Sequence, residues 1–360
     1  MSSLTMLRFA GEEVVLDVHD EARRQIAPVL DFVRPHFSPE PIDALHASCL
    51  RIEIVPFGLW EEPTGTAEIT RVRRARREER HLWGKRWHRA GRKVIAVDSS
   101  QTVFDLAEDG TDARVYVSDS SHFHVTDFIR DLFWELALSG GAGHFVHAAA
   151  VSGGMGAVAF VGAKGAGKTT TALDFIHAGA DFYSGDVLFV DSAGSAAHSF
   201  PDYPGICWGT LRVYPKLFEA AVELGRTPAQ ADSDKILLPH DFYWRALGVP
   251  KAAPPLPLQA IVSVNVTRGG AARLRRSDPV YELLEPMHRK TSDPGQGWQP
   301  FLVAMKRRRT LAAEVAGLAV ERIRPAVPWY ERSGRGRLDV AQISDVLAAV
   351  DARTVVGNPG

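Results

Sequence analysis

The sequence predicts a two-domain α/β protein, with an N-terminal α+β domain over residues 1–139 and a second domain over residues 140–360. Two observations support this fold class. In the centre of the chain, an apolar run at 157–161 is followed by a glycine-rich turn, by helical spacing over 170–178 and by a second apolar run at 187–191. This order of strand, turn, helix and strand is typical of α/β sheets. The beginning of the chain, in addition, carries strand-like runs on either side of a helical segment.

The elements of the N-terminal domain follow from the spacing of its apolar residues. Residues 50–55 alternate apolar and charged side chains, which is typical of a strand that faces water on one side. A helix is predicted over 20–33, closing near Pro35. Residues 123–138 have the stripe of an amphipathic helix, which the glycines at 140–143 end. Further strands are predicted at 13–18, 93–97 and 114–117.

A basic segment at 71–93 contains eleven Lys or Arg residues and two Glu residues, with Trp83 and Trp87 between them. One interpretation is a patch for nucleic acid or for an acidic partner. The other is a solvated strand or loop whose tryptophans pack inward. The net charge of −1 favours the second interpretation and disfavours nucleic acid as a partner, while an acidic protein or peptide substrate stays open.

Composition places the chain among ordinary soluble globular proteins, because 45% of its 360 residues are apolar and 24% are charged. Cys49 and Cys207 lie far apart, so they form neither a disulfide framework nor a metal-binding spacing. The first twenty residues lack the apolar core of a signal peptide, and no apolar run reaches about 18 residues. We therefore expect no membrane segment and a cytoplasmic protein.

The second domain is predicted to begin with a hairpin. Residues 145–151 form a strand of small and apolar residues, and the short turn Gly153–Gly156 joins it to the strand at 157–161. The two strands are therefore expected to be antiparallel. Beyond the central helix, we predict helices at 217–226, from 281 to 287, at 301–318 and at 339–352, and strands at 235–239, 258–266, 272–276 and 323–327, with a loop and strand at 199–216.

The turn after the strand at 157–161 runs from Gly162 to Thr169 and matches G-x-x-x-x-G-K-[ST] completely. Glycine permits the backbone conformations in which consecutive amide groups point inward at phosphate oxygens, and the following helix directs its positive end at the same anion. Lys168 is expected to reach the outer phosphates, and the hydroxyl of Thr169 is expected to ligate Mg²⁺. The residues predicted to bind nucleotide are Gly162, Gly165, Ala166, Gly167, Lys168, Thr169 and Thr170.

Acidic and histidine side chains flank this motif. Asp186 directly precedes the apolar run at 187–191 and is the best second partner for Mg²⁺, because phosphoryl transfer needs an acid near the metal. Its alternative role is that of a turn or cap residue. His147 is as well suited to a structural as to a catalytic role. Asp202, Arg212 and Lys216 lie in a segment rich in turn formers, where they either face substrate or lie on the surface.

This ordered set of features resembles the kinase core of bacterial HPr serine kinase/phosphorylase and its relatives, including the HPr-kinase-like proteins of peptide natural-product clusters. His147 precedes the P-loop in a strand–turn–strand, and Ser184–Val187 follows the P-loop helix where the family has an acidic pair. The resemblance covers roughly residues 140–325. It implies a P-loop kinase core of the HPr kinase/PEP carboxykinase-like type, with ATP and Mg²⁺ as cofactors and Lys168, Asp186 and His147 as catalytic residues.

One position departs from the family. The first acid of the family's pair is thought to take the proton of the acceptor hydroxyl, but this sequence has Gly185 there and keeps only Asp186. General base catalysis contributes about 10²–10⁴-fold, so its loss is serious. Asp202 and His147 are the candidates to replace the base. Two further alternatives are a more acidic acceptor, and a protein that binds nucleotide without transferring phosphate.

Two classes of function therefore remain. The first is an ATP- and Mg²⁺-dependent kinase that acts on a hydroxyl of a peptide, a protein or a small molecule. The second is a non-catalytic, nucleotide-binding regulatory module that uses the basic segment to engage a partner. A motor or a GTPase is disfavoured, because the sequence contains no N-K-x-D guanine motif. Homo-oligomerisation and the choice between ATP and GTP stay open.

Overall fold

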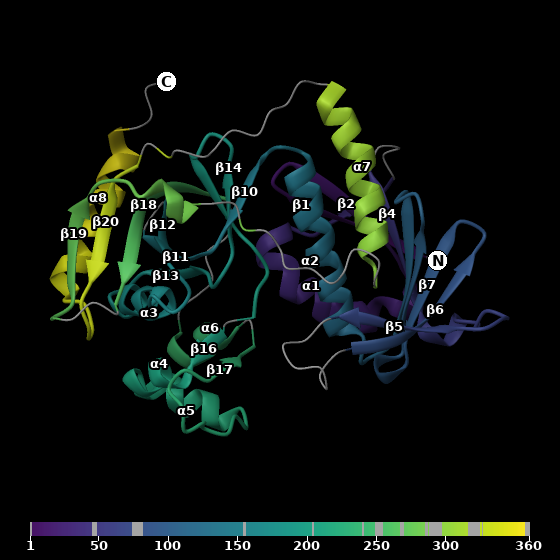
Figure 1. Ribbon diagram of the computed structural model, residues 1–360, viewed down its shortest axis with the longest axis horizontal. Helices are drawn as coiled ribbons and strands as arrows, with labels where there is room; N and C mark the ends of the chain where they lie inside the picture. The colour runs from purple at the N-terminus through teal and green to yellow at the C-terminus, as the bar shows by residue number, and fades with distance from the viewer. Residues whose placement is uncertain are drawn as a thin grey trace. The chain divides into compact units, whose positions relative to one another are not determined.

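The computed structural model describes residues 2–44, 49–73, 82–153, 156–203, 205–239, 241–248, 255–266, 270–284, 287, 297–315, 325 and 327–356. The chain is a mixed α/β protein that divides into two compact units (Figure 1). Unit 1 comprises Met1–Ala142 and Arg289–Ala319, and unit 2 comprises Gly143–His288 and Val320–Gly360. The sequence assigns 289–319 to the second domain, whereas the structure groups this segment with unit 1.

Unit 1 contains, among its described residues, a nine-stranded sheet in the order β3-β1-β2-β4-β9-β8-β7-β6-β5. β4 pairs in parallel with both β2 and β9, and the other neighbours are antiparallel. The predicted strands are therefore present, joined in a mixed sheet. The strands are β1 (Ser2–Phe9), β2 (Glu12–His19), β3 (Glu40–Ile42), β4 (Leu50–Pro56), β5 (Glu68–Arg73), β6 (Leu82–Arg89), β7 (Arg92–Val97), β8 (Thr102–Ala107) and β9 (Asp112–Val117).

Helices cover one face of this sheet. They are α1 (Arg23–Phe37), α2 (His122–Ser139) and α7 (Gln299–Val315). Phe104 of β8 packs against Phe128 of α2 and against Trp298 at the start of α7, with ring centroids 5.3 and 5.0 Å apart. The indole of Trp298 also donates a hydrogen bond of 2.8 Å to Asp131 of α2. These contacts explain why α7, which the sequence places in the second domain, belongs to unit 1.

The other face of the sheet carries a smaller apolar cluster. Alternation along β8 turns Val103 away from the helices, and Val103 is buried there with Trp87 of β6 and Tyr116 of β9. The short 3₁₀ turn Phe57–Leu59 and the following Trp60 pack over this cluster. This face is thus closed by a loop instead of helices.

The first helix is longer than predicted. α1 continues through Pro35 to Phe37 and ends at Ser38, whose φ of 41° is left-handed. The side chain of Phe37 is fully buried, and its ring lies 4.3 Å from that of Phe133 in α2. Packing of the last turn therefore outweighs the hydrogen bond that Pro35 cannot make.

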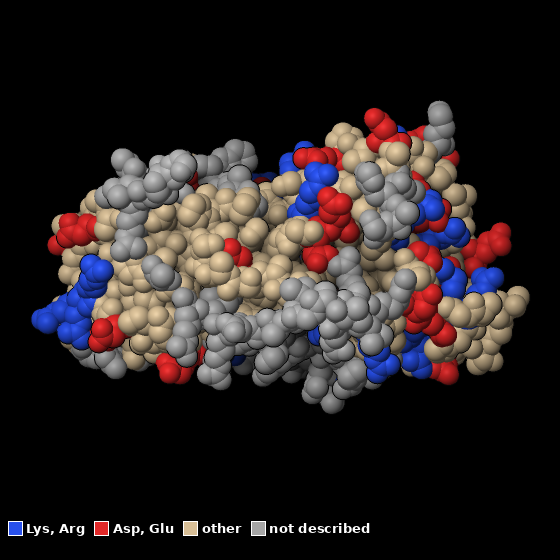
Figure 2. All heavy atoms as spheres, turned by 90° about the horizontal axis from the view of Figure 1, so that it is seen from above, with Lys and Arg blue, Asp and Glu red and all other residues tan. Residues whose placement is uncertain are grey.

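The basic segment forms parts of β5, β6 and β7, and its residues 74–81 lie outside the described residues. Trp87 is buried as predicted, whereas Trp83 is 54% exposed, which the prediction missed. Several of its cations pair with carboxylates of the same unit, and on the face in Figure 2 acidic and basic side chains lie close together. The pairs are Arg86–Glu68, Lys85–Glu62, Lys85–Asp98, Arg92–Asp105 and Arg92–Asp112.

Unit 2 contains, within its described part, a second sheet in the order β10-β14-β15-β18-β12-β11-β13. Outside this path, β20 pairs with β18, and β19 pairs with β20. The predicted hairpin is confirmed, because β11 and β12 are antiparallel, whereas β12, β18 and β20 run parallel. The strands are β10 (Gly143–Val146), β11 (Ala148–Gly153), β12 (Gly156–Val161), β13 (Asp181–Ser184), β14 (Leu188–Asp191), β15 (Ala196–Ser199), β18 (Leu256–Asn265), β19 (Arg273–Ser277) and β20 (Trp329–Ser333).

The core of unit 2 has two sides, which the alternation of the central strands separates. Val158 and Phe160 of β12 pack with α3 (Lys168–His177) and α8 (Val340–Val356). Ala157, Ala159 and Val161 pack on the opposite side, with β14 and β15 among others. Because all these strand residues are buried, β12 reads as one continuous apolar run, as the sequence shows.

A small subdomain of unit 2 lies beside α3. It consists of α4 (Trp208–Val213), α5 (Pro215–Glu223), α6 (Phe242–Leu247) and the two-stranded ribbon of β16 (Gly205–Cys207) and β17 (Lys235–Leu237) (Figure 1). Trp208 and Tyr214 are buried in the same core as α3. The sequence predicts a loop and strand at 199–216, but the structure has the helix α4 within this segment. The helix is stabilised there because its apolar side chains pack in the core.

Three other C-terminal predictions change. The segment from Tyr281 forms the 3₁₀ turn Tyr281–Leu284, and the last strand is β20 instead of 323–327, most of which lies outside the described residues. The helix α8 runs on to Val356. No helix of the described residues is both long and apolar enough to cross a membrane.

Candidate functional site

The P-loop of unit 2 follows β12 and leads into α3. β12 and β18 are parallel, so the loop lies at the carboxyl end of these strands, where ligands bind in many α/β sheets. The amide of Val266, just after β18, donates a 2.9 Å hydrogen bond to the carbonyl of Ala166. Gly165 and Gly167 have φ values of 83° and 98°, which favour glycine. The loop therefore has the backbone that the motif requires.

Lys168 begins α3, and its ammonium group folds back onto the loop. It donates hydrogen bonds to the carbonyls of Gly162 (2.9 Å) and Ala163 (3.2 Å). The side chain is buried, and this burial, together with the nearby Lys235, lowers the pKa of Lys168, although Asp186 opposes the shift. A buried cation held by two neutral carbonyl oxygens can exchange them for phosphate oxygens, which carry negative charge and form stronger hydrogen bonds with it.

The hydroxyls that follow Lys168 have different partners. Thr169, the predicted Mg²⁺ ligand, is half-buried in the first turn of α3. The hydroxyl of Thr170 lies 3.1 Å from that of Thr210 in α4. Thr170 therefore connects the P-loop helix to the subdomain, while its predicted role toward nucleotide stays a prediction.

Asp186 lies between β13 and β14, and a lysine contacts it. The ammonium of Lys235, in β17, lies 2.6 Å from a carboxylate oxygen of Asp186. Lys235 reaches this position across Gly205 of β16, where a Cβ atom would collide with the lysine side chain. The ribbon thus delivers a second lysine to the acid predicted to serve the metal.

His147 lies at the break between β10 and β11, where the sequence predicts one continuous strand. The strand divides there because β10 pairs with β14, whereas β11 pairs with β12 and β13. Burial lowers the pKa of His147, Lys168 and Lys235 lower it further, and Asp186 opposes them. These four side chains therefore lie within electrostatic reach of one another.

The lowered pKa of His147 has a measurable consequence. Below about pH 6.5 an unfolded chain protonates its histidines, whereas folded His147 stays neutral to lower pH, so acidification favours unfolding. The contribution of His147 to the free energy of unfolding is fully present above about pH 6.5 and is lost as the pH falls from there through the lowered pKa of folded His147. We expect His147→Gln to lose less unfolding free energy than wild type between about pH 7.5 and about pH 5.5 in urea titrations. His122→Gln, at an exposed position, is the control, and equal losses in wild type and His147→Gln would contradict the shift.

Gly185 and Asp202 face each other. A Cβ atom at Gly185 would lie 3.6 Å from a carboxylate oxygen of Asp202 and 3.9 Å from the ring of Phe182. The carboxylates of Asp186 and Asp202 both raise the pKa of the buried Tyr243 phenol, after the larger effect of burial. Asp202 therefore lies beside the space that a side chain at position 185 would enter, close to the same tyrosine as Asp186.

No family model matches this chain, and no curated protein matches its sequence.

Unit 2 thus brings His147, Lys168 and Asp186 together at the P-loop, while Asp202 lies beside Gly185, the neighbour of Asp186. Arg212 does not join them, because it pairs with Asp232 and with the carbonyl of Ala229 in the subdomain. The sequence also contains a cationic cluster at 288–290, which lies outside the described residues. Within the described part, no three His, Cys, Asp or Glu side chains converge as a metal site.

The sequence reasoning missed Lys235. It follows Asp186 by 49 residues and belongs to a short strand that is otherwise unremarkable. It also affects the pKa of Lys168, His147 and Cys207, in each case after the larger effect of burial, so it lies near all three groups. The only signal available was Gly205, whose missing side chain leaves room for the lysine.

Proposed function

We propose that unit 2 is an ATP- and Mg²⁺-dependent phosphotransferase of the HPr serine kinase type, with a P-loop kinase core of the HPr kinase/PEP carboxykinase-like kind. The observation that carries the proposal is the grouping of a buried P-loop lysine, Lys168, with His147 and Asp186. A G-x-x-x-x-G-K-[ST] loop alone fits many nucleotide-binding proteins. The histidine and the acid on its two sides fit a kinase that transfers phosphate to a hydroxyl.

The nucleotide half of the site needs little rearrangement. The loop amides and the N-terminus of α3 provide donors for the phosphates. Lys168 exchanges the carbonyls of Gly162 and Ala163 for the outer phosphates. The transferred group carries its charge on its equatorial oxygens, so positioning and charge neutralisation by these groups supply most of the catalysis.

The residues present fit Mg²⁺. The ion prefers oxygen ligands and is often held by one or two carboxylates together with substrate phosphates. Asp186 offers a carboxylate and Thr169 a hydroxyl, which matches that pattern without a cluster of three protein acids. When bound, Mg²⁺ supplies positive charge at the phosphates. Lys235 contacts one carboxylate oxygen of Asp186 in the structure, so the metal would bind through the other oxygen or would displace the lysine.

Asp202 supplies the base that Gly185 lacks. Its carboxylate lies beside the space next to Gly185. In the transfer, the acceptor oxygen forms a bond to the γ-phosphorus, the bond from that phosphorus to the bridging oxygen breaks, and ADP leaves. Asp202 accepts the proton of the acceptor hydroxyl. The acceptor is a peptide, a protein or a small molecule.

A second candidate function is a nucleotide-binding module that does not transfer phosphate. The observation that favours it is Gly185 itself, because glycine cannot take a proton. In that case Lys168 and the loop bind nucleotide, and the protein responds by changing the affinity for a partner. Nucleic acid is a disfavoured partner, because cations of the basic segment pair with carboxylates.

Labelled γ-phosphate separates these two functions. The full chain is incubated with ATP labelled at the γ-phosphate, Mg²⁺ and a set of hydroxyl-bearing peptides and metabolites. We expect label on an acceptor, together with ATP binding measured by calorimetry. Binding without transfer or hydrolysis would favour the module, and the absence of binding would contradict both functions.

A further inference from the structure

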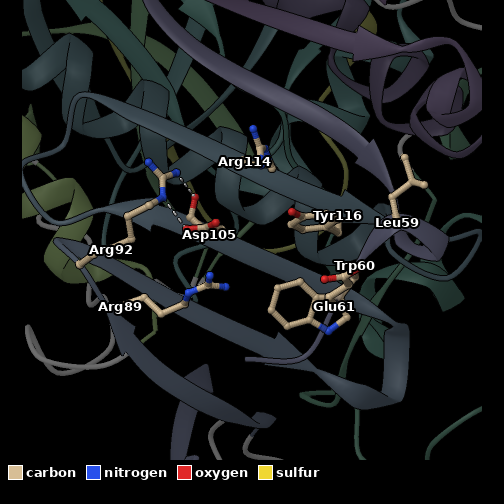
Figure 3. Close-up of a pocket in the computed structure, with 9 residues that line it drawn as sticks. Leu59, Trp60, Glu61, Arg89, Arg92, Asp105, Arg114 and Tyr116 are labelled. Carbon is tan, nitrogen blue, oxygen red and sulfur yellow. Dashed lines mark hydrogen bonds and ion pairs between the residues drawn. The ribbon is translucent and has the colours of Figure 1, made fainter. Parts of the chain in front are cut away.

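A pocket of about 330 Å³ opens on the loop-covered face of the unit 1 sheet (Figure 3). Its floor comes from neighbouring strands: Asp105 of β8 is paired in register with Arg114 of β9, and Tyr116 follows on the same face. Trp60 and Glu61 of the covering loop form one wall, and Arg89 of β6 stands at the other. This volume is within the range of small-molecule sites.

The floor of the pocket is held in place by ion pairs. Arg92 contacts Asp105 at 2.6 Å and Asp112 at 2.8 Å, and its guanidinium also donates to the carbonyl of Asp105 at 3.0 Å. Arg114 contacts Glu53 at 2.7 Å. These groups satisfy one another, so they fix the shape of the floor and leave recognition to the walls.

The aromatic side of the pocket is also fixed. The rings of Trp60 and Tyr116 lie 5.2 Å apart, and Trp60 packs at 6.4 Å from Trp87, which is buried. Leu59 lies next to Trp60 and is 54% exposed. The pocket therefore offers an apolar surface beside its charged groups.

Two charges on the walls are not used within the protein. Among the described residues, the side chains of Arg89 and Glu61 have neither an ion pair nor a hydrogen bond, although both line the pocket. Figure 3 shows the Arg89 side chain extending toward the wall that holds Trp60 and Glu61. A ligand between them meets one unpaired cation and one unpaired anion.

We propose that this pocket binds a zwitterion that bears both an ammonium and a carboxylate group, namely an α-amino acid or a short peptide. Its carboxylate pairs with Arg89, whose planar guanidinium suits a carboxylate, and its ammonium pairs with Glu61. An apolar or aromatic side chain lies against Trp60 and Leu59. A pure anion meets Glu61, and a pure cation meets Arg89, so each alone is disfavoured.

The test is calorimetry of the full chain with each amino acid and with dipeptides, beside their N-acetylated and C-amidated forms. We expect at least one zwitterion to bind, and both blocked forms to bind about tenfold more weakly or worse. Binding of amino acids identifies a free metabolite as the source, and binding of dipeptides alone identifies a peptide. The pocket lies in unit 1, so the result does not depend on nucleotide binding by unit 2.

Two variants locate the binding. Arg89→Gln and Glu61→Gln should each weaken it about tenfold or more, while Arg24→Gln, at an arginine 85% exposed and outside the pocket, should leave it unchanged. Both pocket positions are exposed, so the variants should fold. Absence of binding to every zwitterion, equal binding of the blocked forms, or unaltered binding in both pocket variants would overturn the proposal.

Discussion

Replacing Lys168 with alanine is expected to weaken ATP binding about 30-fold or more, because loss of a buried charged contact costs about 2–5 kcal/mol. The side chain is buried, at 6% exposure, and its ammonium group already contacts carbonyls of the glycine-rich loop. Calorimetry with ATP and Mg²⁺ measures the affinity. Transfer of labelled phosphate should disappear together with binding.

Lys164 provides the matched control for that variant. It lies in the same loop but is exposed, and it is not part of the contacts of Lys168. Lys164→Ala should keep ATP affinity within about threefold, a loss of less than about 1 kcal/mol. Lys168→Met preserves the aliphatic stem and separates a folding defect from loss of the charge. ATP affinity close to that of wild type in folded Lys168→Met would contradict the proposal that this lysine and its loop bind ATP.

Replacing Asp202 with asparagine is expected to lower phosphate transfer by about 10²–10⁴-fold, the usual contribution of a general base. Asparagine has nearly the same shape, so the packing beside Gly185 and Phe182 should persist. ATP affinity should stay close to that of wild type, because the proposed role of Asp202 is toward the acceptor hydroxyl and not toward the nucleotide. Single-turnover transfer together with equilibrium binding distinguishes these two quantities.

His147→Gln is the comparison for Asp202→Asn. Both residues are candidates for the base, and burial lowers the pKa of His147, which makes the imidazole a weaker base. We expect His147→Gln to lose less transfer than Asp202→Asn. A larger loss of phosphate transfer in His147→Gln would identify the histidine as the general base.

Much of the site was predictable, because its parts are local in sequence. The glycines and Lys168 form a contiguous motif, and the apolar run at 157–161 is long enough to identify its strand. The turn at 153–156 is short, which restricts the two strands to a hairpin. Asp186 follows the P-loop helix closely, so its neighbourhood is set by a single connection.

The rest depends on contacts that are distant in sequence. Lys235 reaches Asp186 only because β17 pairs with β16 and Gly205 leaves space for it. The α7 helix belongs to unit 1 because Trp298 packs on α2, a contact between residues 167 positions apart. Periodicity describes one segment at a time and contains no signal for either contact.

Exposure of aromatic residues was equally hard to predict. Trp83 and Trp87 lie on the same strand and on the same face of it, yet Trp87 is buried at 4% exposure and Trp83 is 54% exposed. The difference arises because the covering loop, with Trp60, packs over Trp87. Alternation predicts the shared face and not which part of that face is covered.

We propose that Asp202 takes the place of the acid that Gly185 cannot provide. The position accepts a side chain, since the nearest atoms to a Cβ there are 3.6 and 3.9 Å away. The double variant Asp202→Asn/Gly185→Asp therefore moves the carboxylate back to position 185, and Asp202→Asn/Gly185→Asn is its uncharged control.

Single-turnover transfer of labelled γ-phosphate by these two double variants tests whether Asp202 is the general base. We predict that Asp202→Asn/Gly185→Asp transfers phosphate at least about tenfold faster than Asp202→Asn, as expected for a restored general base. The asparagine control should be no faster than Asp202→Asn. Wild-type transfer in Asp202→Asn, or equal transfer by the two double variants, would contradict this role of Asp202.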